Sequence, residues 1–461
     1  MQQHEHLVII GNGIAGVTLA QQVRKRSNVR ITLISAESAT HFSRPALMYV
    51  YMGHMRYKDI VPYPDWYWRK NNITLVHDRV VSIDFEQKQL HLQKGEPITF
   101  HTLVLATGST TAYYNWPGQH LKGVQGLVTL QDLEQMETQT KGINEAVIVG
   151  GGLIGIEMAE MLKSRGIAVT MLVRDKLYWQ NVLPGQEATL ITQHIQNQGI
   201  NLKLTTELDE ILGDTAGQVG AVKTNTGETI PCQFVGIATG VKPNTDFLRN
   251  TALQLNKGIL IDNQFKTNIP GVYAIGDCAE FREKYEQQPA LEQLWYTARL
   301  HGEALAAILC GKAQNYERGP WFNSAKFLNI EYQTYGYVPN SWDETKYDSL
   351  YWQNTAGTKA IRLFYERDTE MLKGINLLGI RYRHDLCHHW LKQKYKLQDV
   401  IYELEAANFD PEFYRHYEPE LRQLYFNKFP DKAQQKKQNS WWQLRKKFGL
   451  AMHLENSDKP L

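Results

Sequence analysis

The chain has 461 residues, of which 43% are hydrophobic and 21% are charged, and its net charge is +2. This length predicts about three globular domains, and the near balance of charge implies no overall attraction to nucleic acid. Four cysteines in this length do not make a disulfide scaffold, and none are paired as C-x-x-C, so no zinc knuckle or thiol redox motif is visible. We therefore expect a reducing, cytoplasmic setting. No apolar run is long enough to cross a membrane.

The first informative stretch is a glycine-rich turn between an apolar run and a helix-compatible segment, 14–26. A second apolar run, 29–34, follows, and Glu37 stands about twenty residues after the last glycine. The first glycine allows a tight turn, the second lets a pyrophosphate approach the backbone, and the third allows close helix–strand packing. Glu37 can accept hydrogen bonds from a ribose. The glycines are Gly11, Gly13 and Gly16.

A loop that contains Arg44 and Pro45 comes next, followed by a predicted helix with Trp66, Tyr67 and Trp68. Arg44 could contact a pyrophosphate or an isoalloxazine ring, or it could be a surface residue. We expect the three aromatic residues to be packing residues.

Alternating apolar and polar residues in 79–100 predict a small antiparallel meander. An apolar run then ends in Ala106-Thr107-Gly108. A strand that ends in this way brings its backbone to the carboxyl edge of the sheet, next to a bound nucleotide.

The glycine-rich pattern occurs a second time, at Gly150, Gly152 and Gly155, again between a strand-like run and a helix-compatible segment. Two such units predict two nucleotides, most simply a flavin and a nicotinamide. After the second glycine-rich pattern, Val173 and Arg174 occupy the place where a carboxylate would bind the 2′-hydroxyl of NAD. Arg174 favours the 2′-phosphate of NADPH, unless it points to solvent and the neighbouring Asp175 serves NAD instead.

Two later runs also end in glycine. Residues 234–240 mirror the earlier Ala-Thr-Gly ending and close with Gly240, and 272–277 end in Gly276-Asp277. Asp277 suits hydrogen bonding to a bound polyol, or it is an ordinary helix N-cap. Residues 200–232 predict a second small β layer, 291–309 a helix, 321–378 several strands, and 382–425 interrupted helices.

Together these motifs resemble the FAD-dependent pyridine nucleotide oxidoreductases with two dinucleotide-binding domains. Within that superfamily, 42–45 is similar to rubredoxin and ferredoxin reductases, the flavin domain of nitrite reductase, and apoptosis-inducing factor. The resemblance implies that Glu157 and Arg44 lie at the catalytic centre. The residues implied for FAD are Gly11, Gly13, Ile14, Ala15, Gly16, Glu37, Arg44, Pro45, Val81, Ala106, Thr107, Gly108, Gly276 and Asp277. Those implied for the nicotinamide nucleotide are Gly150, Gly152, Leu153, Ile154, Gly155, Glu157, Arg174 and Gly240.

The implied fold is α/β, with two Rossmann-like FAD- and NAD(P)-binding domains and an α+β C-terminal domain. We expect the FAD domain at 1–115 and 241–320, the NAD(P)H domain at 116–240, the C-terminal domain at 321–430 and a basic amphipathic tail at 431–461. Read from the residues alone, Glu157 could instead be a first-turn glutamate favoured by the helix dipole.

Three features outside these motifs need an interpretation. His384, Cys387 and His388 share a helical face, but no further metal ligand is evident, so we expect no metal site. We expect Cys278 to be a small buried hydrophobe. In the tail, Trp441, Leu444 and Phe448 share a face beside several lysines. This pattern is typical of a helix at a membrane surface, of a helix that docks an acidic partner, or of a helix that packs on its own domain.

The predicted function is oxidation of NAD(P)H through FAD, with electrons passed to an external acceptor such as a ferredoxin- or rubredoxin-like protein, a quinone or a small oxidant. The alternative is a nucleotide-sensing interaction protein, similar to apoptosis-inducing factor, in which turnover is incidental. The long C-terminal extension keeps this alternative open.

Overall fold

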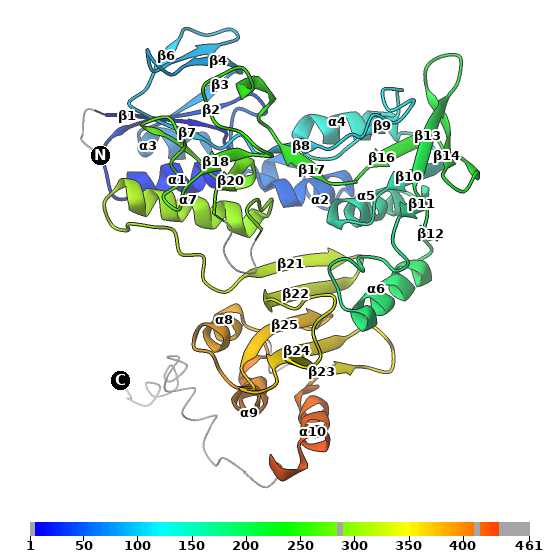
Figure 1. The fold of residues 1–461 in the computed structure, drawn as a ribbon. Helices are drawn as coiled ribbons and strands as arrows, with labels where there is room; N and C mark the ends of the chain where they lie inside the picture. Colours follow the sequence, from blue (N-terminus) through cyan, green and yellow to red (C-terminus); the bar gives the residue numbers. More distant parts are fainter. Residues whose placement is uncertain (1–4, 284–288, 410–414, 433–461) are drawn as a thin grey trace, which may run out of the picture. The chain divides into compact units, whose positions relative to one another are not determined.

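The structure is a computed structural model that describes residues 5–283, 289–409 and 415–432. The chain divides into two compact units (Figure 1). The first unit comprises Met1–Tyr178 and Gln196–Arg318, and the second comprises Trp179–Ile195 and Gly319–Leu461. A short segment from the middle of the sequence therefore belongs to the unit formed by the C-terminal part of the chain.

The first unit contains a five-stranded parallel sheet built on the first glycine-rich turn. Its strand order is β19-β7-β1-β2-β3. Helices α1 (Ile14–Arg24) and α7 (Trp295–Leu309) pack side by side against it (Figure 1). Their contact is close, because a Cβ added to Gly302 would lie 2.6 Å from the Ala15 carbonyl oxygen. The strands are β1 (His6–Ile10), β2 (Arg30–Ser35), β3 (Ile73–His77), β7 (Thr102–Leu105) and β19 (Val272–Ala274).

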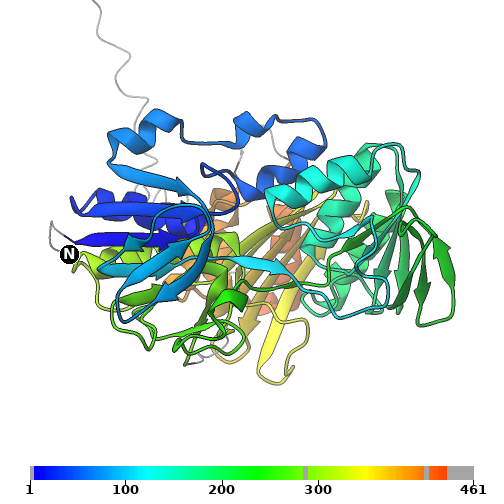
Figure 2. The same ribbon diagram turned by 90° about the horizontal axis from the view of Figure 1, so that it is seen from above.

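The connection from β2 to β3 is a run of short helices: η1 (Arg44–Ala46), α2 (Leu47–Tyr51), η2 (Tyr57–Ile60) and α3 (Asp65–Lys70). Figure 2 shows this run apart from the strands of the sheet. Trp68 is 2% exposed and packs in the core, but Trp66 is 56% exposed. The packing role predicted for all three aromatic residues is therefore wrong for Trp66, because only one side of so short a helix faces the sheet.

The predicted meander is confirmed as the antiparallel sheet β4-β5-β6, formed by Val80–Asp84, Gln89–Leu92 and Ile98–Thr99. Two short strands, β8 (Ser109–Thr111) and β17 (Val241–Pro243), pair with each other where the chain leaves and re-enters the first nucleotide-binding region. Two further strands, β18 (Ile259–Ile261) and β20 (Ala279–Phe281), also pair, and two 3-10 turns complete this part, η3 (Asp246–Leu248) and η4 (Gly276–Cys278).

The second glycine-rich turn lies on a second five-stranded parallel sheet, with strand order β12-β11-β10-β16-β9. Helices α4 (Leu130–Gln139) and α5 (Leu153–Ser164) belong to this region. The strands are β9 (Val124–Gln125), β10 (Glu145–Val149), β11 (Ala168–Val173), β12 (Asn201–Leu204) and β16 (Phe234–Ile237). Residues 201–204 were expected in a separate β layer. They instead pair in parallel with β11, because the period-2 pattern does not reveal which sheet a strand joins.

The separate β layer is shorter than predicted. It consists of β13 (Leu208–Gly213), β14 (Val219–Thr224) and β15 (Thr229–Pro231), which form an antiparallel sheet. Helix α6 (Gly185–Asn197) connects β11 to β12, and its first eleven residues belong to the second unit.

The second unit contains an antiparallel sheet with strand order β21-β22-β25-β24-β23 and an apolar core that includes Trp390 and Ile401. Glu187 of α6 forms a buried ion pair with Arg362 of β24, with side chains 1% and 3% exposed. The elements are β21 (Phe322–Phe327), β22 (Ile330–Gly336), β23 (Tyr347–Gln353), β24 (Ala360–Glu366), β25 (Leu372–Leu378), α8 (His384–Lys392), α9 (Leu397–Ala407), α10 (Glu418–Lys428) and η5 (Pro430–Lys432).

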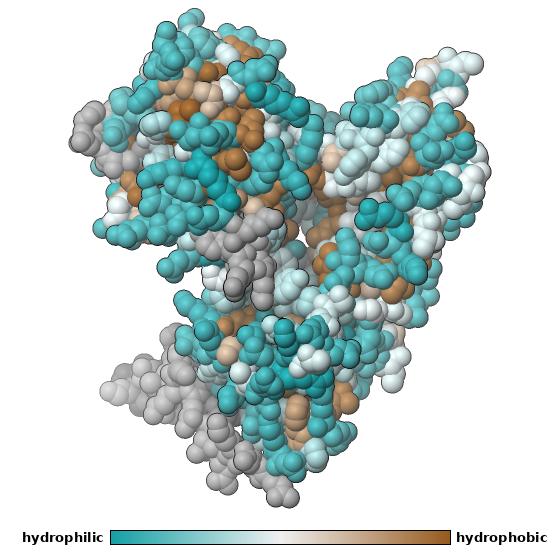
Figure 3. All heavy atoms as spheres, viewed as in Figure 1, coloured by the Kyte–Doolittle hydropathy of each residue, from teal (hydrophilic) through white to brown (hydrophobic). Residues whose placement is uncertain are grey.

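The predicted fold class is confirmed: two Rossmann-like parallel sheets and a C-terminal α+β region. The visible face of each unit is largely hydrophilic, with small apolar patches (Figure 3). No helix within the described residues combines the length and apolar character needed to span a bilayer.

Candidate functional site

A cavity of about 1080 Å³ in the first unit lies at the carboxyl ends of β1, β2, β7 and β19. It brings together most residues that sequence analysis assigned to the flavin, together with two from the second glycine-rich unit. The predicted residues that line it are Gly11, Gly13, Ile14, Ala15, Glu37, Arg44, Pro45, Val81, Ala106, Thr107, Gly108, Gly276, Asp277, Ile154 and Glu157.

Seven predicted residues do not line this cavity: Gly16, Gly150, Gly152, Leu153, Gly155, Arg174 and Gly240. Gly16 packs behind the first turn, where a Cβ would lie 2.0 Å from the Gly11 carbonyl oxygen. The other six belong to the second turn, its first helix or the ends of strands β11 and β16.

The backbone of the first turn explains why its glycines are needed. Gly11 has φ +116°, and a Cβ there would lie 2.0 Å from the Ala106 carbonyl oxygen. A Cβ on Gly13 would meet no protein atom within 4 Å, so this backbone is open to the cavity. Helix α1 begins directly after Gly13 with no side-chain cap and no acidic residue in its first turn. Its free N–H groups therefore favour an anion.

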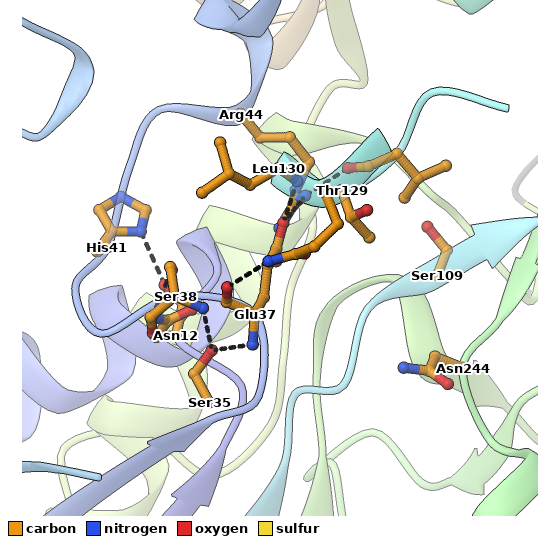
Figure 4. Close-up of polar contacts among 12 residues, drawn as sticks. Asn12, Ser35, Glu37, Ser38, His41, Arg44, Ser109, Thr129, Leu130 and Asn244 are labelled. Carbon is orange, nitrogen blue, oxygen red and sulfur yellow. Dashed lines mark hydrogen bonds and ion pairs between the residues drawn. The ribbon is translucent and has the colours of Figure 1, made fainter. Parts of the chain in front are cut away.

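Asn12, between the first two glycines, fixes the loop that follows β2 (Figure 4). Its Nδ2 donates to the carbonyl oxygen of Ser38 at 3.0 Å, and the Nδ1 atom of His41 lies 2.8 Å from the Asn12 carbonyl oxygen. Burial lowers the pKa of His41, so the ring is neutral near pH 7 and donates this bond. Sequence analysis missed both residues, because a lone Asn or His carries no motif.

Glu37 and Arg44 both line the cavity and form an ion pair with each other. Arg44 Nη1 and Nη2 donate to the two Glu37 carboxylate oxygens at 2.8 and 2.6 Å (Figure 4). Glu37 also accepts from the backbone N–H of Leu130, the first residue of α4, at 2.8 Å. A carboxylate at this position is favoured by the helix dipole. Arg44 additionally donates to the Val128 carbonyl oxygen. The predicted ribose acceptor and the predicted flavin-contacting arginine therefore form one cluster, which the sequence did not indicate.

Asp277 also lines the cavity and accepts a hydrogen bond from Ser109 Oγ at 3.0 Å. Burial raises the pKa of the Asp277 carboxyl, while the Ser109 hydroxyl and the Arg44 charge oppose that rise. Asp277 is the middle residue of η4, whose N-cap is Ile275, so the N-cap alternative is wrong. Sequence analysis did not single out Ser109, although it directly follows the Ala-Thr-Gly ending.

The second turn repeats the first. Gly150 has φ +121°, and a Cβ there would lie 2.3 Å from the Ala238 carbonyl oxygen. Tyr178 is fully buried and its hydroxyl donates to the Gly152 carbonyl oxygen at 2.7 Å, a support that sequence analysis missed. Helix α5 has no acidic residue in its first turn, so the dipole explanation for Glu157 is wrong. Burial, and secondarily the Glu160 charge, raises the pKa of Glu157 to about 7.

Val173, the last residue of β11, is buried, and the side chain of the next residue, Arg174, is 71% exposed. Arg174 Nε lies 3.9 Å from the Asp175 carboxylate. Such an exposed pair binds weakly and leaves the guanidinium available to a ligand.

Cys278 is fully buried and its Sγ donates to the Leu105 carbonyl oxygen at 3.4 Å, in agreement with its prediction as a small hydrophobe. In the second unit the His384 ring packs on Phe322 at 4.4 Å. Among described residues, no group of three or more His, Cys, Asp or Glu side chains could hold a metal ion. The predicted amphipathic helix at Trp441–Phe448 lies outside the described residues.

Known proteins resemble this chain over most of its length. The profile of the family described as pyridine nucleotide-disulphide oxidoreductase matches residues 5–302. A nitrite reductase [NAD(P)H] of Bacillus subtilis is 30% identical over 386 residues, which cover 81% of this chain and 45% of that protein. A rubredoxin-NAD(+) reductase of Pseudomonas putida is 28% identical over 319 residues, covering 68% of this chain and 83% of the relative.

The chain thus spans about half the length of the nitrite reductase that it matches. Among solved structures, a ferredoxin reductase from Rhodopseudomonas palustris has the same fold, with a TM-score of 0.74, 24% identity, and coverage of 89% of this chain and 98% of that one. The profile match extends over both glycine-rich turns and over every residue that lines the cavity, from Ile10 to Ala298. On this evidence the chain belongs to the pyridine nucleotide-disulphide oxidoreductase family.

Proposed function

We propose that this protein is an FAD-dependent oxidoreductase that takes electrons from NAD(P)H and passes them to an external acceptor. The observation that carries the proposal is the single cavity in which the first glycine-rich turn, Asp277 and Glu157 meet. This cavity combines an open backbone for a pyrophosphate with carboxylates for hydroxyl groups. It is also lined by Ile154 of the second glycine-rich turn.

The cavity residues fit FAD. The open backbone at Gly13 and the uncapped start of α1 suit a pyrophosphate. Asp277 offers its Oδ1 atom to a polyol hydroxyl, because Ser109 occupies only Oδ2. Glu37 has an unfilled acceptor position on Oε2 for a ribose hydroxyl, although its Oε1 already accepts two bonds. A flavin bound here would supply two-electron exchange with a nicotinamide and stepwise electron release.

The second turn fits a nicotinamide nucleotide. Gly152 is open in the same way as Gly13, since a Cβ there would come no closer than 3.9 Å to any other residue. The α5 N-terminus carries no side-chain cap and suits the pyrophosphate. Arg174 would hold a 2′-phosphate, which favours NADPH, whereas Asp175 would favour NADH. Glu157 reaches the shared cavity and would orient the nicotinamide end.

The acceptor we propose is a small redox protein of the ferredoxin or rubredoxin kind, with a quinone or small oxidant as alternatives. The support is the rubredoxin-NAD(+) reductase relative, most of whose length the chain matches. The nitrite reductase relative extends well beyond this chain, so its substrate carries less weight.

Two measurements test the proposal. Purified protein should be yellow and release FAD on denaturation, and anaerobic stopped-flow mixing with NADPH or NADH should bleach the flavin absorbance. Reoxidation against a panel of ferredoxin, rubredoxin, quinone and ferricyanide then identifies the acceptor class. A colourless protein that cannot be reconstituted with FAD would refute the proposal. A reduced flavin that no acceptor in the panel reoxidises would favour the nucleotide-sensing alternative.

We also propose that the tail at 431–461 contacts a membrane surface through its basic aromatic segment. The support is the sequence pattern alone, with Arg445, Lys446 and Lys447 beside Trp441 and Phe448. Full-length protein should sediment with anionic vesicles, and a chain ending at 430 should not. Equal sedimentation of both chains, or none at low ionic strength, would leave the tail as a packing segment.

A further inference from the structure

Ser109 and Asp277 meet because of the sheet. They follow two neighbouring parallel strands, β7 and β19, in which Leu105 and Ala274 are register partners. Each comes directly after a glycine with positive φ, +70° at Gly108 and +73° at Gly276. These glycines turn both chains at the same edge, so that the Ser109 hydroxyl reaches Asp277 Oδ2 at 3.0 Å.

The backbone at Ser109 is held in place by a second chain segment. The N–H of Asn244 donates to the Gly108 carbonyl oxygen at 2.9 Å, and Thr107 Oγ1 donates to the Asn244 carbonyl oxygen at 2.8 Å. Strand β8 starts at Ser109 and pairs with β17 at Pro243. In Figure 4 Ser109 and Asn244 lie on adjacent chain segments, apart from the Glu37–Arg44 cluster. The hydroxyl is therefore presented to Asp277 by a fixed backbone.

The other charged and titratable groups near Asp277 do not replace this donor. Arg44 attracts the carboxylate, but its guanidinium is bound by Glu37. The thiol of Cys278 donates to backbone carbonyl oxygens. His301 accepts the N–H of Gly276 on Nδ1, and burial lowers its pKa to about 3, so it carries no charge. Within the described residues, Ser109 is the one side chain hydrogen-bonded to Asp277.

We propose that Ser109 is a positioning residue that holds Asp277 as an ionised hydrogen-bond acceptor for a polyol hydroxyl of FAD. The proposal rests on the proposed function, because it presumes that FAD occupies this cavity. A hydroxyl that donates to a carboxylate stabilises the charged form and fixes one oxygen, which leaves Oδ1 directed to the ligand. Without the donor, the buried carboxyl takes up a proton at a higher pH and loses its charge.

The test measures the affinity for FAD as a function of pH, from the fluorescence of released FAD at equilibrium. In the wild type, affinity is full above the pKa of Asp277 and falls as the pH drops through it. Ser109→Ala raises that pKa, so the fall begins about one pH unit higher, and affinity at a pH below both pKa values drops roughly tenfold. Ser109→Thr keeps the hydroxyl and should restore the wild-type profile.

A double-mutant cycle with Asp277→Asn shows whether Ser109 acts through Asp277. An asparagine side chain does not titrate, so the loss of FAD affinity at low pH disappears in Asp277→Asn. Adding Ser109→Ala to this variant should change the affinity less than twofold. An equal loss in both backgrounds, or an unchanged pH profile in Ser109→Ala, would overturn the inference. Thermal unfolding at saturating FAD checks that each variant folds. Wild-type protein that binds no FAD at any pH would instead refute the proposed function.

Discussion

The first glycine of each turn has almost the same left-handed backbone, with φ of +116° at Gly11 and +121° at Gly150. A Cβ on Gly11 would overlap the carbonyl oxygen of Ala106, which follows the neighbouring strand β7. A Cβ on Gly150 would overlap that of Ala238, which follows the neighbouring strand β16. Both helices that follow begin at a glycine with no side-chain cap. The two turns thus offer the same pyrophosphate site.

The surroundings of the two turns differ. The first turn opens into a cavity that is lined by two carboxylates, Glu37 and Asp277. The second contributes only Ile154 and Glu157 to that cavity, and the residue after its second strand is the exposed Arg174. The first turn is therefore accompanied by two carboxylates that suit ribose and polyol hydroxyls, whereas the second is accompanied by an exposed cation that suits a phosphate.

Each turn lies in a region built on one of the two parallel sheets. The two regions also differ in the connection that follows their second strand, from β2 to β3 in the first region and from β11 to β12 in the second. In the first region this connection is the run of short helices that includes α2 and α3. In the second region it is α6, whose first eleven residues are anchored in the second unit by Glu187 and Arg362. Arg362 also donates to Ser349 and Gln186. The first eleven residues of α6 are therefore held within the second unit by a buried ion pair.

The largest predicted effect tests that ion pair. Arg362→Met leaves the Glu187 carboxylate buried without its partner, and should destabilise the second unit by about 3–5 kcal/mol. Denaturant unfolding measured by tryptophan fluorescence gives this value. Arg381→Ala, which breaks an exposed pair with Glu331 in the same unit, is the control and should cost less than about 1 kcal/mol. A similar loss in both variants would contradict the role given to the buried pair.

The next effect separates the two turns as ligand sites. Gly13→Ala and Gly152→Ala each add a methyl group that the protein accommodates but a pyrophosphate does not. Each should weaken its own nucleotide by about 2–3 kcal/mol, as expected for overpacking. FAD content should fall in Gly13→Ala alone, and reduction by NAD(P)H should slow in Gly152→Ala while FAD is retained. Loss of FAD in both variants would show that the second turn does not form a separate site.

A comparable or smaller effect concerns the choice between NADPH and NADH. Arg174→Ala removes one charge-assisted contact to a 2′-phosphate, worth about 1.5–3 kcal/mol, and should raise KM for NADPH roughly 10- to 150-fold. KM for NADH should change little. Lys223→Ala, an exposed cation on the β13–β14 hairpin, is the control for net charge. If Arg174→Ala raises both KM values equally, the contact is not to the 2′-phosphate and Asp175 becomes the better candidate for specificity.

The last effect, of comparable size, is the pH dependence at Glu157. Its pKa is raised to about 7 from the ordinary value of 4.5, so in the folded protein it is protonated below that pH and ionised above it. Because the folded state binds this proton more tightly than the unfolded state, Glu157 destabilises the fold increasingly between about pH 4.5 and 7. Glu157→Gln removes that cost. Its gain in the free energy of unfolding over wild type should grow by about 3 kcal/mol from pH 4.5 to 8, because each pKa unit corresponds to about 1.4 kcal/mol.

A difference between Glu157→Gln and wild type that does not change with pH would show that the Glu157 carboxyl titrates normally. The same variant should also remove any step near pH 7 from the rate of flavin reduction. Glu160→Gln, one turn away on α5, is the matched control, because the Glu160 charge affects the pKa of Glu157 only secondarily.

Local patterns were sufficient where the backbone itself determines the structure. The glycine spacing, the apolar strands and the Ala-Thr-Gly endings predicted both parallel sheets and most of the cavity wall, because tight turns and close backbone contacts require particular residues. The same patterns assigned residues 201–204 to the wrong sheet and Trp66 to the core. Alternation of residue types shows that a strand or helix exists, but not its neighbours.

The tertiary structure decided the contacts between distant segments. Ser109 meets Asp277 across 168 positions, Glu37 meets Leu130 across 93, and Glu187 meets Arg362 across 175. A serine, a leucine N–H or an arginine has no special local pattern, so its role depends on the strand order that places it at a shared edge or in a shared core. The sequence alone determined that two nucleotide-binding turns form. The arrangement of the strands decided which side chains surround the first and anchor the helix after the second, because that arrangement depends on how the whole chain packs.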